Sequence, residues 1–230
     1  MAKHKLVALM PMRHHSQRVP GKNYRPFGDG RPLYQHTLEN LLAVPEIEKV
    51  VIDTDSPVVK EQCAEKYRDV IVLDRPEHLR APEIPMNDIL THDATQVDSE
   101  FYIQTHSTNP LLKNETMAAA VSLFFKQYPI YDSLFGVTVI RDRIWDVLGR
   151  AVNHNPNILL QTQDLPKWLV LENSTMYIFE RNRLLNDRNR IGNRPYLFEV
   201  PEIEARDIDI ELDFQVTELL YKALRSGSDA

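Results

Sequence analysis

Strand-like and helix-like patterns alternate along the first half of the chain, and this alternation restricts the possible folds more than any other feature. Four short apolar runs have the length and composition of buried strands: residues 5–10, 49–56, 69–74 and 100–105. Helical patterns follow these runs, beginning near Pro32, Pro57, Asn87 and Asn114. Strand alternating with helix is typical of a parallel sheet covered by helices on both faces. The sequence therefore predicts a three-layer α/β fold with a mainly parallel sheet.

The loops that leave the four predicted strands carry most of the unusual polar side chains. These loops are residues 12–23, 53–56, 74–80 and 104–110. Because the carboxyl ends of parallel strands lie at one edge of a sheet, the loops are expected to gather on one side. Ligands of such sheets bind outside this edge. We therefore expect the functional site there.

The pattern becomes irregular after Tyr131. A strand is predicted at 134–140, but the next stretch mixes short apolar runs with Asn, Pro and Asp residues. An inserted arm or subdomain over roughly 141–190 fits this stretch better than a continuation of the sheet. Core-like residues return at 174–179, and residues 207–225 indicate a strand end followed by a helix. The chain of 230 residues is expected to form a single domain, 1–230, that carries this arm.

The loop after the first predicted strand is purely basic although the chain is acidic. No Asp or Glu occurs in residues 1–28, whereas the net charge of the chain is −6. Arg13, Arg18 and Lys22 have the spacing R-x-x-S-x-R-x-P-x-K-N, which matches neither G-x-x-x-x-G-K-[ST] nor G-x-G-x-x-G. Such a loop suits several phosphates in a row, because arginine and lysine both bind phosphate oxygens. Charge alone leaves a solvated basic loop as an equal alternative.

The stretch DIDIELD, residues 207–213, places Asp207 and Asp209 two positions apart. On an extended segment both carboxylates would lie on one face, with Ile208 and Ile210 on the other. Adjacent carboxylates repel each other unless a cation lies between them, and oxygen ligands of this kind suit Mg²⁺. An amphipathic edge strand explains the pattern equally well. Together with the basic loop, however, the acidic pair favours a triphosphate site with Mg²⁺ as cofactor.

Four stretches together resemble the acylneuraminate cytidylyltransferase family, that is, the CMP-sialic acid synthetases and related CMP-ulosonic acid synthetases. The stretches are RHHSQRVPGKN, DRPEHLR, QTHSTNPLL and ARDIDIELDFQVTELL, and their order and spacing carry the resemblance. It implies a three-layer nucleotide-binding fold with a mainly parallel sheet and an inserted dimerisation arm, for which residues 141–190 are the candidate. It also implies a homodimer in which the arm of one subunit closes over the sugar pocket of the other.

The resemblance assigns roles to individual residues. The nucleotide-binding positions of the family correspond to Arg13, Ser16, Arg18, Lys22, Asn23 and Arg75. Among them, Arg13 and Lys22 correspond to the pair that binds the triphosphate, and Asn23 and Arg75 to the residues that hold cytosine and its ribose. Asp207 and Asp209 correspond to the magnesium ligands. These two aspartates, with Arg13 and Lys22, form the predicted catalytic set.

Departures from the family pattern gather around the predicted acceptor pocket. Gln104 and Asn173 match positions that approach the sugar acid in the family. His106 and Asn109 stand where Ser, Thr and Pro are usual, and Ser174 replaces a glycine. Because a glycine lets a substrate approach closely, Ser174 is expected to narrow the pocket. The resemblance therefore makes CTP a safer assignment than any particular acid.

The sequence predicts a nucleotidyltransferase that transfers CMP from CTP to a 3-deoxy-2-ulosonic, sialic-acid-like acid and releases pyrophosphate. One alternative keeps the reaction but changes the acid to an eight-carbon ulosonate or a phosphonate. Another is a glycosyltransferase that uses the D-x-D acids to hold a nucleotide sugar. A third is a nucleotide-binding module without turnover.

The composition also restricts the partners and the location. The partners expected are CTP and a small acidic sugar, and the overall acidity argues against a nucleic acid. The apolar run before Arg13 is too short for a signal peptide or a membrane span. We therefore expect a cytoplasmic protein without a membrane partner.

Overall fold

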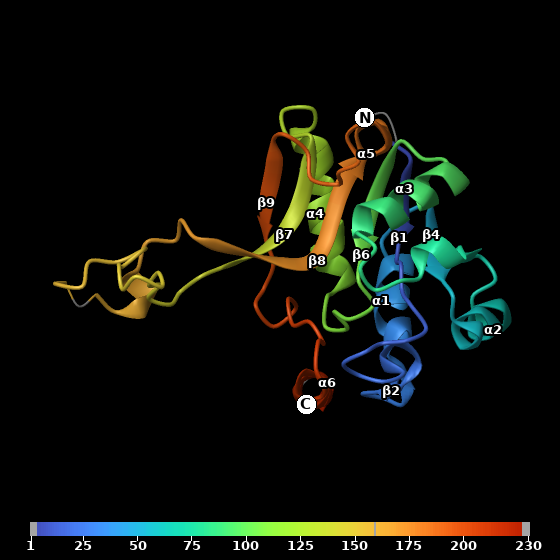
Figure 1. The fold of residues 1–230 in the computed structure, drawn as a ribbon, viewed down its shortest axis with the longest axis horizontal. Helices are drawn as coiled ribbons and strands as arrows, with labels where there is room; N and C mark the ends of the chain where they lie inside the picture. Colours follow the sequence, from blue (N-terminus) through green and yellow to red (C-terminus); the bar gives the residue numbers. More distant parts are fainter. Residues whose placement is uncertain (1–3, 159, 227–230) are drawn as a thin grey trace.

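The computed structural model describes residues 4–158 and 160–226, and a seven-stranded sheet forms the centre of the molecule (Figure 1). The strands lie in the order β5-β4-β1-β6-β8-β7-β9. Their bounds are β1 Leu6–Leu9, β4 Lys49–Thr54, β5 Ile71–Asp74, β6 Phe101–Thr105, β7 Ser133–Val139, β8 Val170–Glu180 and β9 Pro195–Glu199. Pairing is parallel from β5 through β4 and β1 to β6, and again between β7 and β9. The prediction of a mainly parallel sheet is confirmed.

Strand β8 is the exception, because it is antiparallel to both of its neighbours, β6 and β7. The chain leaves the sheet after β7, forms a projection and comes back as β8 (Figure 1). A strand that returns in this way runs opposite to the strand before it, as in a hairpin. The sequence predicted the core character of residues 174–179 but not this direction.

Helices cover both faces of the sheet, which confirms the prediction of three layers. Helices α1 Leu33–Leu42, α2 Pro57–Lys66 and α4 Asn114–Gln127 pack on one face, and α3 Met86–Gln96 and α5 Arg181–Asp187 pack on the other. Strand β1 shows the reason, since Leu6 and Ala8 contribute to the first core and Val7 and Leu9 to the second. Within the described ranges, no helix combines the length and the apolar character that a bilayer crossing requires.

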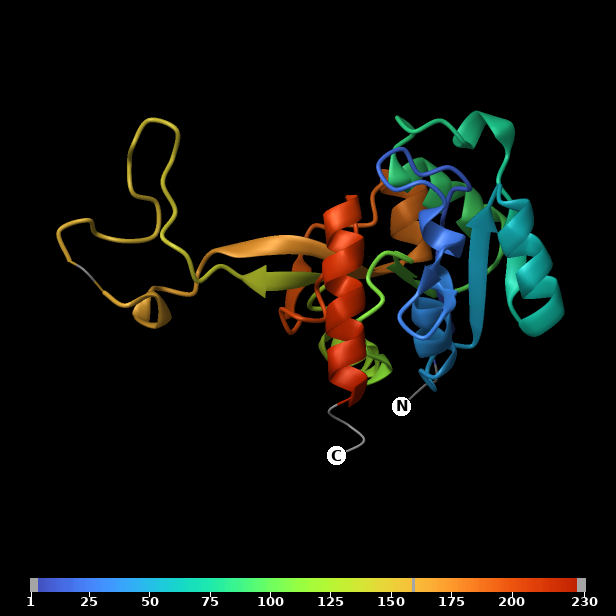
Figure 2. The ribbon, with the colours of Figure 1, turned by 90° about the horizontal axis from the view of Figure 1, so that it is seen from below.

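A third, smaller core joins the last helix, α6 Glu211–Ser226, to the loop after β1 and to the short strands β2 Pro26–Phe27 and β3 Arg31–Pro32. Its buried members are Val19, Phe27, Leu33, Leu111, Ile208, Phe214 and Tyr221. Figure 2 shows α6 beside the sheet and outside its two helical layers. These apolar contacts therefore hold the C-terminal helix against the basic loop.

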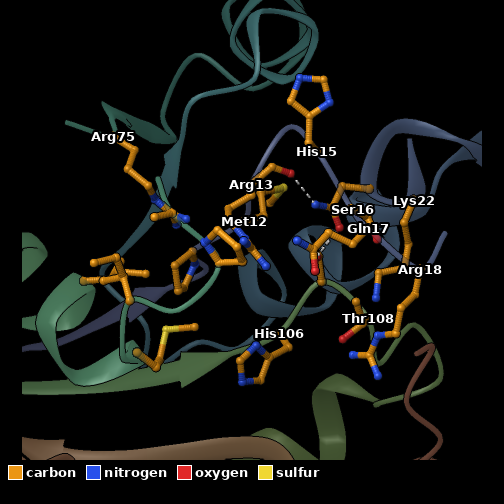
Figure 3. Close-up of a pocket in the computed structure, with 18 residues that line it drawn as sticks. Met12, Arg13, His15, Ser16, Gln17, Arg18, Lys22, Arg75, His106 and Thr108 are labelled. Carbon is orange, nitrogen blue, oxygen red and sulfur yellow. Dashed lines mark hydrogen bonds between the residues drawn. The ribbon is translucent and has the colours of Figure 1, made fainter. Parts of the chain in front are cut away.

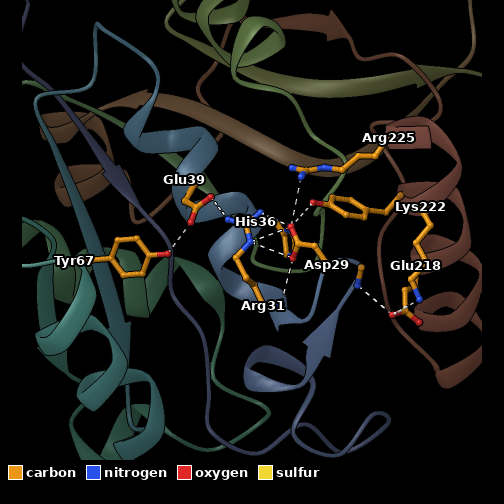
Figure 4. Close-up of polar contacts among 10 residues, drawn as sticks. Asp29, Arg31, His36, Glu39, Tyr67, Glu218, Lys222 and Arg225 are labelled. Atoms are coloured by element: carbon orange, nitrogen blue, oxygen red, sulfur yellow. Dashed lines mark hydrogen bonds and ion pairs between the residues drawn. The ribbon is translucent and has the colours of Figure 1, made fainter. Parts of the chain in front are cut away.

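Polar contacts centred on Asp29 fix α6 in the same position (Figure 4). The Asp29 carboxylate accepts a hydrogen bond from Tyr221 Oη at 2.9 Å and one from Arg31 Nη2 at 2.8 Å, and Arg225 Nη1 lies 3.6 Å away. Hydrogen bonding from Arg31 lowers the pKa of Asp29, so this carboxylate stays ionised. A Cβ at Gly28, whose φ is 60°, would collide with the Tyr221 ring. The close approach of α6 therefore requires glycine at this position.

The strand end predicted at residues 207–210 is wrong, because these residues join no strand. Ile208 is fully buried, whereas Ile210 is 46% exposed, so the two isoleucines do not share a buried face. The reason is the start of α6. The Asp213 carboxylate accepts the N–H groups of Asp209 at 3.0 Å and Ile210 at 2.9 Å, which caps the helix at its N-terminus.

Residues 140–169 project from the body of the molecule between β7 and β8 (Figures 1 and 2). The described residues of this projection form one short 3-10 helix, Thr162–Asp164, and one isolated β-bridge. The projection is shorter than the arm expected at 141–190, because the second half of that stretch forms β8 and α5 and packs into the body. Its exposed large apolar side chains are Trp145, Val147, Leu148, Val152, Ile158, Leu160 and Trp168.

Candidate functional site

The loops that follow β1, β5 and β6 surround a cavity of about 440 Å³ at the carboxyl edge of the sheet (Figure 3). The segment after β5 supplies one wall, which includes Ile84, Met86 and Ile89. The basic loop supplies the opposite wall, so Arg75 faces Arg18 and Lys22 across the cavity (Figure 3). The expectation that these loops gather at one edge is confirmed. The loop after β4 contributes from behind, where Asp55 Oδ1 accepts the His14 N–H at 2.7 Å.

The predicted nucleotide-binding residues of the basic loop other than Asn23 all line this cavity: Arg13, Ser16, Arg18 and Lys22. Two of them also contact the segment that precedes α6. Arg18 Nη2 donates to Asp209 Oδ1 at 2.5 Å, and Lys22 Nζ donates to the Ile208 carbonyl. The basic loop and the acidic stretch, which lie at opposite ends of the sequence, therefore meet at one point. The negative charge of Asp209 thereby offsets part of the positive charge of the basic loop.

Lys22 and Asp207 influence each other across this contact. Burial lowers the pKa of Lys22, and the charges of Asp207 and Asp209 oppose that shift. Burial raises the pKa of Asp207, and the charge of Asp209 adds to the increase. A carboxylate whose proton affinity rises beside a second carboxylate is a group that a divalent cation would stabilise. The donor set of Asp207 and Asp209 is thus chemically compatible with the predicted magnesium ion.

A second cavity, of about 490 Å³, lies between the base of the projection and α6. Asp207 lines it, together with Asn173 and Ser174 from β8, two of the residues predicted to contact the acceptor. Ser174 has a φ of 55°, which lies in the region that favours glycine. The family that the sequence resembles has a glycine at this position. Lys22 lines the first cavity and Asp207 lines the second. The contact between the basic loop and the segment before α6 therefore lies at the boundary of the two cavities.

Asn23 and Arg75 line the first cavity, but both are also engaged within the protein. Asn23 Nδ2 donates to the Arg13 carbonyl at 2.8 Å, and Asn23 Oδ1 accepts from Ser107 Oγ at 2.9 Å. The Asn23 side chain thus fastens the loop after β1 to the loop after β6. Arg75 is 2% exposed, and its Nε donates to the Asp53 carboxylate.

Asp53 and Arg75 form a buried cluster of charged residues with Asp93, from α3. Burial, followed by the charge of Asp53, raises the pKa of Asp93 well above its usual range. Among the described residues, Asp53 is the neighbour that interacts with the Asp93 carboxyl and contributes to this shift. Neither Asp93 oxygen has another hydrogen-bond partner there. These surroundings favour the protonated form of the Asp93 carboxyl.

Asp93→Asn should make the protein more stable than wild type in alkaline solution. The folded state of the wild type holds a proton on Asp93 that the unfolded chain releases above its ordinary pKa, so wild-type stability falls as the pH rises. An amide donates the same hydrogen bond and cannot ionise. Denaturant unfolding should show the advantage of the variant growing by more than about 1 kcal/mol between pH 5 and pH 8. Asp98→Asn, at a side chain that is 81% exposed, is the control. A constant difference across this range would contradict the prediction.

Of the remaining residues predicted to contact the acceptor, one lines a cavity and two do not. His106 lines the first cavity, and burial together with the charges of Arg190 and Lys22 lowers its pKa to about 3, so its ring is neutral. Gln104 and Asn109 are fully buried and line neither cavity. Asn109 Nδ2 donates to the Arg206 carbonyl at 3.3 Å, which supports the segment that carries Asp207.

Several residues at the site were not predicted from the sequence. Gln17 and Thr108 line the first cavity, Asp53 and Asp93 lie beneath it, and Arg190 contacts Gln104. Gln17, Asp53 and Thr108 stand inside loops that were already assigned to the site, so their position was the available signal. Asp93 and Arg190 act through partners distant in sequence, and no local pattern marks them.

Comparisons with known proteins identify related chains. A family model described as Cytidylyltransferase matches residues 7–224. Post-translational flagellin modification protein B of Campylobacter coli is 27% identical over 218 residues, which cover 90% of this chain and 91% of that protein. N-acylneuraminate cytidylyltransferase of Escherichia coli is 24% identical over 219 residues, which cover 92% of this chain and 51% of that protein. Among solved structures, a CMP:2-keto-3-deoxy-manno-octonic acid synthetase complexed with CTP has a TM-score of 0.67 at 19% identity, over 97% of this chain and 99% of that chain.

Proposed function

The chain belongs to the cytidylyltransferase family, and from this premise we propose that it transfers CMP from CTP to a 3-deoxy-2-ulosonic acid and releases pyrophosphate. It is a nucleotidyltransferase. The observation that carries the proposal is the meeting of Arg18 and Lys22 with the Asp207–Asp209 segment at the boundary of two cavities. One cavity offers basic groups for a triphosphate, and the other offers polar groups for a second substrate.

The basic loop supports the departure of pyrophosphate. The acceptor hydroxyl attacks the α-phosphorus of CTP, a new P–O bond forms, and the bond from the α-phosphorus to the bridging oxygen breaks. The hydroxyl proton is lost to solvent, and pyrophosphate leaves with the bond electrons. Arg13 and Lys22 would neutralise the β- and γ-phosphates of this leaving group. The reaction needs no covalent nucleophile, because positioning and charge neutralisation account for most phosphoryl-type catalysis.

Asp207 and Asp209 would hold the magnesium ion. When bound, the ion supplies Lewis-acid polarisation of the phosphoryl group and neutralises its charge. The chain's own part is to present the two carboxylates at a fixed place. Asp213 contributes by capping α6 directly behind Asp209, and Asn109 contributes by binding the Arg206 carbonyl.

The projection, residues 140–169, supports a homodimer. Monomeric proteins rarely expose contiguous apolar surface, and a protein partner is the usual reason for it. The exposed tryptophans Trp145 and Trp168 are suited to the centre of such an interface. We place this projection over the sugar pocket of a second copy, as an arm that covers the acceptor. The expected site of the reaction is the cytoplasm, where CTP is made.

The first test is nucleotide choice. We expect CTP to support pyrophosphate release at a rate at least about tenfold above ATP and GTP, because Asn23 and Arg75, which correspond to the residues that hold cytosine and its ribose in the resembling family, line the first cavity. The assay is magnesium-dependent pyrophosphate release, with a panel of ulosonic acids that includes 3-deoxy-manno-octulosonic acid and N-acetylneuraminic acid. Equal rates with ATP and CTP would exclude the assignment.

The same assay separates the alternative functions. A glycosyltransferase would consume a nucleotide sugar and would release no pyrophosphate from CTP. A binding module would bind CTP without turnover of any acid. The basic loop argues against the first alternative, since a nucleotide sugar contains no triphosphate. An eight-carbon ulosonate as acceptor would appear directly as a difference within the panel, and a phosphonate would appear once phosphonates are assayed beside it.

A further inference from the structure

Arg190 is an arginine at the carboxyl edge of the sheet whose direct contacts, among the described residues, are with neutral groups. It follows α5 in the chain and is half-buried. Its Nη1 donates to Gln104 Oε1 at 2.6 Å, and its guanidinium carbon lies 3.5 Å from the centre of the Tyr177 ring. Its backbone N–H donates to Asn87 Oδ1 at 3.2 Å. Strands β6 and β8 therefore fix the guanidinium, and α3 fixes the backbone of the same residue.

These contacts hold the guanidinium in place through neutral groups, and the charge of Glu172, which accepts a hydrogen bond from Tyr177, acts on it only from beyond ion-pair distance. In the part of the chain that the structure describes, no carboxylate lies within ion-pair distance of Arg190. The nearby Arg183, in contrast, lies 3.2 Å from Asp132 and 2.8 Å from Asp187. Burial lowers the pKa of Arg190, but arginine starts so high that it remains charged. A half-buried cation held by a neutral amide and an aromatic ring is favourable when an anion completes its coordination.

The location of Arg190 indicates which anion can reach it. Its charge acts on His106, which lines the first cavity. The hydroxyl of Tyr177, the residue beneath its guanidinium, contacts Glu172 and Ser174, which line the second cavity. Arg190 itself lines neither cavity, but its neighbours on the side of β6 and β8 belong to both. The phosphate-binding residues lie on the loop after β1 instead.

We propose that Arg190 binds the carboxylate of the acid acceptor and thereby selects 2-ulosonic acids over uncharged sugars. This inference rests on the proposed function. A guanidinium matches a carboxylate with two parallel hydrogen bonds, and Gln104 and Tyr177 fix its plane before the substrate arrives. Gln104, predicted from the sequence to touch the sugar, instead orients the residue that does. Neutral His106 adds no competing positive charge beside it.

The test pairs a change in the protein with the matching change in the substrate. Acceptors would be the panel acid that supports turnover and its C1 carboxamide, each assayed with wild type, Arg190→Met and Arg190→Lys. We expect Arg190→Met to raise the KM for the acid about 30-fold or more and to change the KM for the carboxamide by less than about threefold. Arg190→Lys should recover part of the affinity for the acid.

Two controls make the result specific. Arg194→Met removes an exposed positive charge from the same segment and should leave both acceptors unaffected. CTP affinity, measured by calorimetry, should be unchanged in Arg190→Met. A large loss of CTP affinity would show that Arg190 binds a phosphate and would overturn the proposal. Equal effects on acid and carboxamide would overturn it as well, because they would indicate a purely structural role. If wild type is inactive with every acid, the proposed function itself fails.

Discussion

Asp209→Asn should lower turnover by about a hundredfold or more, which corresponds to about 3 kcal/mol in the activation barrier. An amide keeps the shape of the side chain but removes the charge that the proposed magnesium site requires. The stability of the fold should change little. Arg18 and Asp209 form an ion pair whose side chains are 61% and 50% exposed, and exposed pairs contribute little to stability.

The control for this variant is Glu211→Gln. Glu211 lies two residues further along and pairs with Arg25 at 2.7 Å, outside both cavities, so its replacement removes the same charge without touching the site. The rate of pyrophosphate release would be measured over a magnesium titration for both variants. A near-normal rate for Asp209→Asn at saturating magnesium would show that the acidic stretch serves only to start α6.

Lys22→Met should reduce kcat/KM for CTP by about 100- to 1,000-fold, the size of effect seen when one charge-stabilising donor is removed. The Lys22 ammonium is held at the boundary of the cavities by the Ile208 carbonyl, so it is oriented before CTP binds. Methionine fills a similar volume and suits the partly buried stem. The loss should therefore appear in activity rather than in folding.

Two further variants make the Lys22 result interpretable. Lys126→Met removes an exposed lysine at the end of α4 and should have no effect on rate. Lys22→Arg keeps the charge in a larger group, and it should retain more activity than Lys22→Met. If all three variants matched wild type, the basic loop would be a solvated loop, the alternative that its charge alone had left open.

The sequence predicted the layers of the fold well, because those features follow from local periodicity. Strands β1, β4, β5 and β6 and the helices after them each carry their own apolar pattern. Periodicity gives no direction for a strand that returns from an insertion, so the antiparallel course of β8 was missed. It also made residues 207–210 look like a strand, because the cap provided by Asp213 was not recognised.

The site was predicted in part, and the division has a physical basis. Residue type and spacing predicted that Arg13, Arg18 and Lys22 act together, and all three line one wall of the first cavity. Side chains with two uses were harder to predict. Gln104 was expected to face the substrate, but its oxygen accepts a hydrogen bond from Arg190, which is 86 positions away in the sequence. Such pairings depend on which loops fold next to each other, and a single sequence carries no local sign of them.

The contact between the basic loop and the residues before α6 has a consequence for the order in which the molecule becomes competent. Lys22 and Ile208 are separated by 186 residues, and Arg18 and Asp209 by 191. The last strand, β9, ends at Glu199, so every strand of the sheet has been synthesised before Asp207 and Asp209 are added. A chain that has completed its sheet therefore still lacks the acidic half of its charged site. Competence would arrive only when the segment that carries Asp207 and Asp209 packs against the basic loop.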